Sequence, residues 1–307
     1  MATLRDIRSR ISSVKNTQKV TRAMKMVAAA KLRKAQERIF QTRPYATEIG
    51  EIISHVKGKS DPTSHPLFLE REERLGVLLI VITGDRGLAG AFNGNITRLT
   101  EQTIERECAS QHAAGRLYLA GVGRKGYDYF ARRGYQMAGD YRGVFRDLGF
   151  GIAQKIGELA IDGFVEGRWD EVKLIYNEFK NTIAQNRIVE PFLPIPAEHF
   201  LTPVMEMFVE HQAEVQEGRI VDYIFEPDAR TILDVLVPRY LNYQIWRALL
   251  ESNAAEQGAR MVAMDNATTN ADELLRTLRL QYNRARQSAI TKELLEIVAG
   301  ADALASG

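Results

Sequence analysis

Residues 4–39 read LRDIRSRISSVKNTQKVTRAMKMVAAAKLRKAQERI, and the spacing of their apolar side chains decides the fold. Apolar residues recur at alternating intervals of three and four, which places them on one stripe of an α-helix. The stripe turns polar in its middle, at Gln18, Thr21 and Lys25. The pattern predicts one helix of a coiled coil, with apolar seam positions at Leu4, Ile7, Ile11, Val14, Ala28, Leu32, Ala35 and Ile39.

This helix is predicted to be very long. No Gly or Pro precedes Pro44, and good helix formers fill the positions outside the stripe. One helix ending near His55 or Lys57 would measure roughly 80 Å at 1.5 Å per residue. Because an isolated helix of this kind is marginal in water, residues 1–57 need a partner helix.

The partner is predicted at the other end of the chain, over residues 228–307. The same three-four spacing recurs there, and no Pro follows Pro238, which is expected to mark a kink or the first turn. The two end helices would form an antiparallel coiled coil with the middle of the chain inserted between them. The predicted seam of the second helix is Met264, Ala267, Ala271, Leu274, Leu278 and Ala285.

The middle of the chain, residues 75–226, predicts an inserted Rossmann-like α/β domain. The breaker-rich segment 58–63 precedes it, and apolar runs then alternate with helical stretches, as in a largely parallel sheet. Residues 203–217 are too polar and irregular to assign. The expected strands are Gly76–Thr83, Leu117–Val122, Val172–Phe179 and Ile220–Phe225, and the expected helices lie near Asn95–Gln111, Lys125–Arg133 and Ile152–Gly163.

Composition is that of an ordinary globular chain of 307 residues, 45% of them apolar. The longest apolar run, Val77 to Ile82, is too short to cross a bilayer, and no secretory signal pattern begins the chain, which favours the cytosolic side. Charge is unevenly distributed, because residues 1–45 hold twelve Lys or Arg against two acids while the whole chain carries +2. Cys108, the single cysteine, excludes an intrachain disulfide.

The most enzyme-like stretch is VITGDRGLAGAFN, residues 81–93, where a strand, a glycine-bearing turn and a helix start follow one another. Its glycines, Gly84, Gly87 and Gly90, lack the G-x-G-x-x-G spacing, and no Lys-Ser or Lys-Thr completes a P-loop. A Rossmann-like nucleotide-binding protein stays open as an alternative function. Asp85 and Arg86 could supply acid chemistry, although a salt bridge locking the turn is the commoner role.

Other chemistry has little support in the sequence. The five histidines are scattered without metal-ligand spacing, and no Gly-x-Ser-x-Gly motif occurs, so we expect no metal, no cofactor and no catalytic residue. The basic first helix could instead bind nucleic acid, which is the second alternative. Its cations lie all round the helix, however, with no aromatic residue before Phe40.

Two long blocks, one at each end, resemble the γ subunit of F-type ATP synthases. At the start these are IRSRI (7–11), NTQKV (16–20) and TRAMKMVAAAKLRKAQ (21–36). Near the end they are ARMVAMDNATTNA (259–271) and YNRARQSAITKELLEIVAGA (282–301). Weaker matches in the middle are DRGL (85–88), GRKG (123–126) and YIFEP (223–227). The resemblance covers nearly the whole chain.

The resemblance implies a non-catalytic rotor in the central stalk, coupling ion-driven rotation of the c-ring to ATP synthesis or hydrolysis at the β subunits. One copy would stand inside the hexamer of α and β subunits, with the α/β domain against ε and the c-ring. It would be a peripheral membrane protein at the cytoplasmic face of the cell membrane. No cofactor and no nucleic acid are implied.

The same resemblance implies contact residues, carried over by motif. A β-subunit contact is expected at Met24, Lys25, Arg260, Arg286, Gln287 and Thr291. An apical bearing is expected at Leu294, Leu295, Ile297 and Val298, and a c-ring or ε contact at Tyr223 and Glu226.

Two departures from the family pattern are Ala89, where many members carry Cys, and the long stretch 196–218, whose contacts are hard to predict. Neither lies in the predicted coiled coil. The dithiol insertion of chloroplast relatives is missing, so no thiol regulation is expected.

Overall fold

The computed structural model describes residues 3–59, 65–71, 73–196, 202–205 and 229–305. A long helix occupies each end, α1 over Leu4–Lys59 and α7 over Ala229–Ala305, which confirms the predicted end helices. Pro238 lies inside α7, well past its first turn. The predicted strand 220–225 and the unassigned segment 206–217 fall outside the described residues.

Burial along α1 follows the predicted seam without interruption. From Leu4 to Ile39 the positions at alternating steps of three and four are buried or half-buried, including Gln18, Thr21 and Lys25. On α7 the prediction was wrong at Leu274, which is 47% exposed, while the neighbouring Leu275 is buried. The three-four alternation continues from Thr268 to Leu275, so the adjacent leucine takes the seam position.

The protein divides into two compact units, one of residues 1–27 with 261–307 and one of residues 28–260. In the first unit the polar middle of the seam is a series of cross-helix pairs. Thr21 Oγ1 lies 2.8 Å from Thr268 Oγ1, and Lys25 Nζ lies 2.6 Å from Asp265 Oδ1.

A third pair joins Gln18 to Asp272. Since the partner numbers on α7 fall as those on α1 rise, these contacts define an antiparallel pair of helices.

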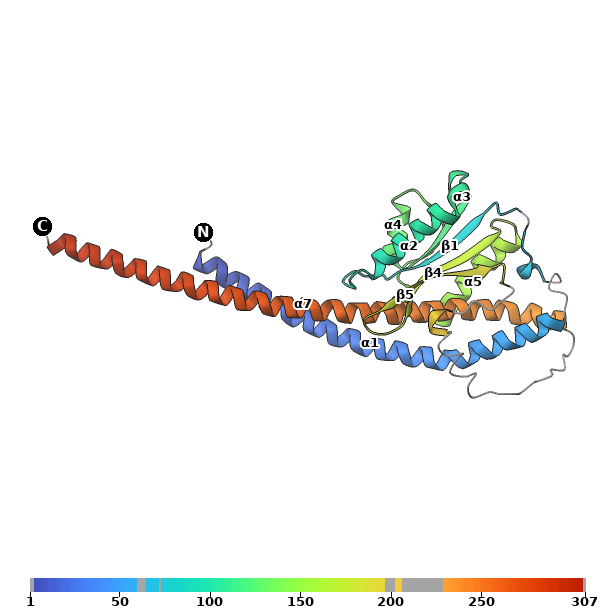
Figure 1. Ribbon diagram of the computed structural model, residues 1–307, viewed down its shortest axis with the longest axis horizontal. Helices are drawn as coiled ribbons and strands as arrows, with labels where there is room; N and C mark the ends of the chain where they lie inside the picture. Colours follow the sequence, from blue (N-terminus) through green and yellow to red (C-terminus); the bar gives the residue numbers. More distant parts are fainter. Residues whose placement is uncertain (1–2, 60–64, 72, 197–201, 206–228, 306–307) are drawn as a thin grey trace. The chain divides into compact units, whose positions relative to one another are not determined.

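The second unit is built on a five-stranded sheet of order β3-β2-β1-β4-β5 (Figure 1). β1, β2, β3 and β4 are parallel, and β5 is antiparallel to β4. The largely parallel sheet is therefore as predicted. The strands are β1 (Val77–Ile82), β2 (Leu117–Val122), β3 (Gln136–Tyr141), β4 (Glu171–Phe179) and β5 (Gln185–Leu193).

Helices cover both faces of this sheet (Figure 1). On one face, Leu78 and Ile80 of β1 join a core with α5 (Phe150–Val165) and the residues of α7 and α1 that belong to this unit. On the other face, Leu79 packs with α2 (Phe92–Glu107) and α4 (Arg124–Ala131). Burial from both sides explains why β1 is a continuous apolar run. Short helices η2 (Pro66–Phe68), α3 (Ala109–Ala113) and η3 (Val144–Arg146) connect these elements.

The edge strands β3 and β5 are absent from the sequence prediction. β3 has Gly, Asp and Gln among its six residues, and β5 carries Pro191, which an edge strand tolerates because one side of its backbone has no partner strand. Edge strands are only partly buried, so they lack the apolar run that reveals a central strand.

One glycine fixes the packing of α5 against the sheet. A Cβ on Gly163 would lie 2.0 Å from Trp169 Cζ2, and Trp169 is buried with its Nε1 donating to Ala160 O at 2.9 Å. A Cβ on Gly151, in the same helix, would have only Gln154 Oε1 within 4 Å, at 3.9 Å. The two sites therefore differ in packing alone.

We expect Gly163→Ala to lower the free energy of unfolding by about 2 kcal/mol or more, because the added methyl overpacks the Trp169 ring. Gly151→Ala should be neutral or stabilising by about 0.5 kcal/mol, because alanine restricts the unfolded chain. Urea unfolding of both variants measures this. Equal stabilities for the two variants would contradict the predicted close packing.

Candidate functional site

The last part of α7 extends beyond α1. With Thr21 opposite Thr268 in an antiparallel pair, Leu4 lies roughly opposite Ala285. The rest of α7 therefore runs past the start of α1, as Figure 1 shows for the two chain ends. Every described side chain over 291–301 is exposed.

Three of the residues predicted to contact the β subunit and the four residues of the predicted apical bearing lie on this overhanging end of α7. Arg286 and Gln287 are exposed, and Thr291 donates its hydroxyl to Gln287 O within the helix, at 3.0 Å. The four bearing residues form an exposed apolar group, with Leu294 57%, Leu295 64%, Ile297 67% and Val298 55% exposed. Together they are the largest run of exposed apolar side chains among the described residues of α7.

Two predicted contact residues on α1 lie at or beside the seam. Met24 is half-buried, and Lys25 forms its ion pair with Asp265 of α7 while keeping 40% of its side chain exposed. The structure thus gives the Lys25 ammonium a partner within the chain. Such a half-exposed pair contributes only about 0.2–1 kcal/mol to stability, so exchange for another acidic partner costs little.

Arg260 is turned inward, toward the strand-turn segment after β1. Its side chain is only 12% exposed, and its Nη2 lies 2.5 Å from Glu256 Oε1 and 3.2 Å from Gly87 O. Arg260 therefore fastens α7 to the glycine-bearing turn. The i,i+4 spacing of Glu256 and Arg260 was a signal that the sequence analysis did not use.

Glu256 is the buried acid of this pair. Burial raises its pKa above the ordinary value of 4.5, although the nearby Arg260 guanidinium acts in the opposite direction. Its carboxylate packs on Gly84, where a Cβ would lie 2.8 Å from Glu256 Cδ. Glycine at this position therefore allows helix and turn to touch.

The turn after β1 also contacts the start of α4, a second strand-to-helix turn of the same sheet. The backbone N–H of Arg124 donates to Asp85 Oδ1, that of Lys125 to Gly84 O, and that of Gly126 to Thr83 Oγ1. The N–H groups that a helix start offers to an anion thus already have acceptors within the chain. This argues against phosphate binding at the start of α4.

Asp85 does lock the turn, but not through the salt bridge that the sequence suggested. Its carboxylate accepts from the backbone N–H groups of Gly143 at 2.7 Å and Phe145 at 3.2 Å, besides that of Arg124. Among the described contacts, none pairs it with Arg86. The Asp85 carboxylate thus accepts from three backbone N–H groups at once. A single ion pair with Arg86 would not replace these three bonds.

The remaining expectations concern parts that the structure does not describe or groups that it does not bring together. Tyr223 and Glu226, predicted to contact the c-ring or ε, lie outside the described residues. Over the described ranges, no three His, Cys, Asp or Glu side chains converge as metal ligands. Within the same ranges, no helix has a stretch long and apolar enough to cross a membrane.

Two long antiparallel end helices around an inserted α/β sheet define a class of protein, the central-stalk subunit of a rotary ATPase. Comparisons with known proteins support this class. A family model described as ATP synthase matches residues 3–304. An ATP synthase gamma chain of Salinibacter ruber is 62% identical, and one of Chloroherpeton thalassium is 51% identical, each over 99% of both chains.

Solved structures agree with the fold. A chain of the central stalk and c-ring of Tetrahymena thermophila mitochondrial ATP synthase matches at 26% identity with a TM-score of 0.54, over 81% of this chain and 99% of that one. A chain of the Euglena gracilis mitochondrial enzyme has a TM-score of 0.65 at 19% identity, over 99% of this chain and 95% of that one.

The chain therefore belongs to the ATP synthase γ chain family. It is a non-catalytic subunit of the central stalk of an F-type ATP synthase. This assignment replaces both alternatives raised by the sequence, the nucleotide-binding protein and the nucleic-acid-binding protein.

The raised pKa of Glu256 leads to a prediction about pH. An acid with a raised pKa in the folded state binds its proton more tightly when folded, so stability falls as pH rises from 4.5 through the raised pKa. Glu256→Gln removes this titration. Its free energy of unfolding relative to the unaltered chain should therefore increase across that window.

Urea unfolding at several values between about pH 4 and about pH 8 measures the difference. Glu105→Gln, at an exposed position of the same unit, is the control, and the difference for Glu256→Gln should change more with pH than that of this control. A difference for Glu256→Gln that changes with pH no more than that of the control would show that burial does not shift this carboxyl.

Proposed function

We propose that this chain is the rotor that couples ion-driven rotation of the c-ring to ATP synthesis or hydrolysis at the β subunits. It binds inside the hexamer of α and β subunits as one copy per complex, with ε and the c-ring as further partners. Its place is peripheral, at the cytoplasmic face of the cell membrane. Functionally the chain divides into helices 1–57 and 228–307 and the inserted domain 75–226.

The observation that carries this proposal is the overhanging end of α7. A helix without a partner is marginal in water, and its exposed Leu294, Leu295, Ile297 and Val298 would favour aggregation unless covered. A ring of subunits closing around the helix end supplies such a cover from every side. A flat partner would cover one side only.

The coupling of rotation to nucleotide binding follows from the asymmetry of the two end helices. Two helices of unequal length present a different surface in each direction, whereas a hexamer of alternating subunits repeats every third of a turn. Each orientation of the helices then favours a different nucleotide affinity at each β site, which links rotation to binding through differential contacts. Polar contacts suit this motion, because they give orientation without a large apolar interface.

Each predicted contact residue has a role in this proposal. Arg286, Gln287 and Thr291 are exposed and free to engage a loop of β. In this proposal the basic residues of α1 would face acidic β segments. Met24 and Lys25 contact β from the seam, with Lys25 exchanging Asp265 for a β carboxylate.

The other two contact regions depend on the inserted domain. Arg260 contributes to β contact through the turn that it holds at Gly87. Tyr223 and Glu226 are assigned to the c-ring and ε on resemblance alone.

The test is reconstitution of the full chain with bacterial α and β subunits. We expect one copy to co-elute per hexamer and ATPase activity to depend on it. A chain that elutes alone, beside an α and β complex of unchanged activity, would overturn the proposal.

The same complex, bound to the membrane-embedded part of the enzyme, tests the role of Arg286 and Gln287. Arg286→Ala with Gln287→Ala should reduce ATP-driven proton pumping, because the β loop loses its partners, while stability changes by less than about 0.5 kcal/mol. Arg279→Ala, exposed on the paired part of α7, is the matched control. Pumping equal to that of the control would remove the assigned role from both residues.

A further inference from the structure

A fully buried charge network joins α7 to the two last strands of the sheet. Arg247 on α7 and Glu190 on β5 are 9% and 4% exposed at their side chains. Tyr176 on β4 is completely buried between them. All of these residues belong to the unit of residues 28–260.

Every nitrogen of the Arg247 guanidinium has an acceptor. Both Glu190 oxygens lie 2.6 Å from Nη2, the Tyr176 hydroxyl lies 2.9 Å from Nη1, and Gln244 Oε1 lies 3.1 Å from Nε. The Tyr176 hydroxyl in turn donates to Glu190 Oε2 at 2.7 Å. The group is thus a closed network that connects three elements.

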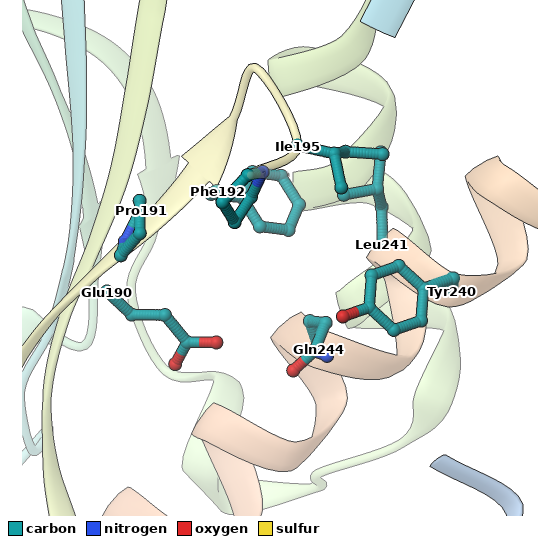
Figure 2. A pocket seen from close by; sticks show the side chains of 8 residues that line it. Glu190, Pro191, Phe192, Ile195, Tyr240, Leu241 and Gln244 are labelled. Atoms are coloured by element: carbon teal, nitrogen blue, oxygen red, sulfur yellow. The ribbon is translucent and has the colours of Figure 1, made fainter. Parts of the chain in front are cut away.

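A small pocket lies beside the network, between β5 and α7. Figure 2 shows Glu190 on one side of it and Tyr240 and Gln244 on the other. Its volume of about 20 Å³ holds one water at most, so it is too small for a substrate or cofactor. The network therefore acts between parts of the protein itself.

Stability alone does not account for this arrangement. A buried ion pair is often no more stabilising than well-packed apolar residues of similar volume, because its charges lose their hydration. The surrounding core already contains leucines and isoleucines that would fill this space. The network adds a fixed geometry between helix and sheet. Hydrogen bonds fix distances and angles, whereas apolar contacts allow packed helices to slide by small amounts.

We propose that Arg247 is a positioning residue and that its network with Glu190, Tyr176 and Gln244 is the joint that transmits torque between the sheet domain and α7. This inference rests on the proposed rotor function. The network can carry load from the sheet into the helix, because β4 and β5 are neighbouring strands and both are bonded to the same guanidinium.

Further polar contacts along α7 support a joint rather than a single chance pair. Glu251, one turn after Arg247, accepts from the backbone N–H of Phe179 at 3.1 Å, at the end of β4. Arg260 then reaches Gly87 O after β1. Three positions spread over about four turns of α7 are thus bonded to different strands or to the turn after one, which resists both turning and axial sliding.

The experiment compares an apolar network with the natural one in the complete membrane-bound complex. The triple variant Arg247→Met, Glu190→Leu and Tyr176→Phe approximately keeps the volume and removes both charges together with the tyrosine hydroxyl, so that no buried charge is left alone, while the neutral Gln244 stays. Unfolding of the purified chain is measured first. The matched control is Arg168→Met with Glu166→Leu, an ion pair of the same unit that is 48% and 60% exposed.

Two readouts separate a joint from a merely structural network. We expect the triple variant to hydrolyse ATP normally but to pump about half as many protons per ATP, because α7 slides or turns under load. Single-molecule angular fluctuations of the rotor should widen in the same variant. The control should match the unaltered complex in both.

Normal pumping and unchanged fluctuations in a folded triple variant would overturn the inference while leaving the rotor function intact. An unaltered complex that fails to couple would instead overturn the rotor function. If the triple variant does not fold, Tyr176→Phe removes only one hydroxyl. Unchanged angular fluctuations in Tyr176→Phe would then count against the joint, and wider fluctuations would support it.

Discussion

The polar centre of the seam between α1 and α7 is the constraint on which the rest of the structure depends. Apolar side chains alone would let two such helices pair in several registers, since each three-four step offers an equivalent position. The Thr21 to Thr268 pair and the Lys25 to Asp265 pair match in one antiparallel register only. That register sets where α1 starts along α7 and leaves the last turns of α7 exposed.

The polar contacts of the inserted domain are consistent with a domain that transmits force and does not bind a ligand. The strand-turn segment that resembles a phosphate site uses Asp85 to bind backbone N–H groups at the start of α4 and at Gly143. Buried polar groups are directed to backbone and to one another, as in the Arg247 network, and few face a cavity. Family membership and geometry therefore lead to the same account, in which function lies in contacts rather than in catalysis.

The features that depend on strong local patterns could be predicted from the sequence. The end helices followed from periodicity, and the central strands from apolar runs buried on both faces. The edge strands and the exact seam position at Leu275 depended on partners far along the chain. The pairing of Arg247 with Glu190 was equally invisible, because 57 residues separate them and no local signal links a helix arginine to a strand glutamate. The predicted contact residues came from the resemblance to the γ subunit family and not from a pattern in the sequence.

Disulfide trapping in the purified chain tests the seam register most directly. Thr21→Cys with Thr268→Cys places two thiols where the hydroxyls are 2.8 Å apart, and native Cys108 is fully buried and out of reach of the oxidant. The account predicts rapid crosslinking for this pair and little for Thr17→Cys with Thr268→Cys, one helical turn away. Equal crosslinking of both pairs, or faster crosslinking of the shifted pair, would contradict it.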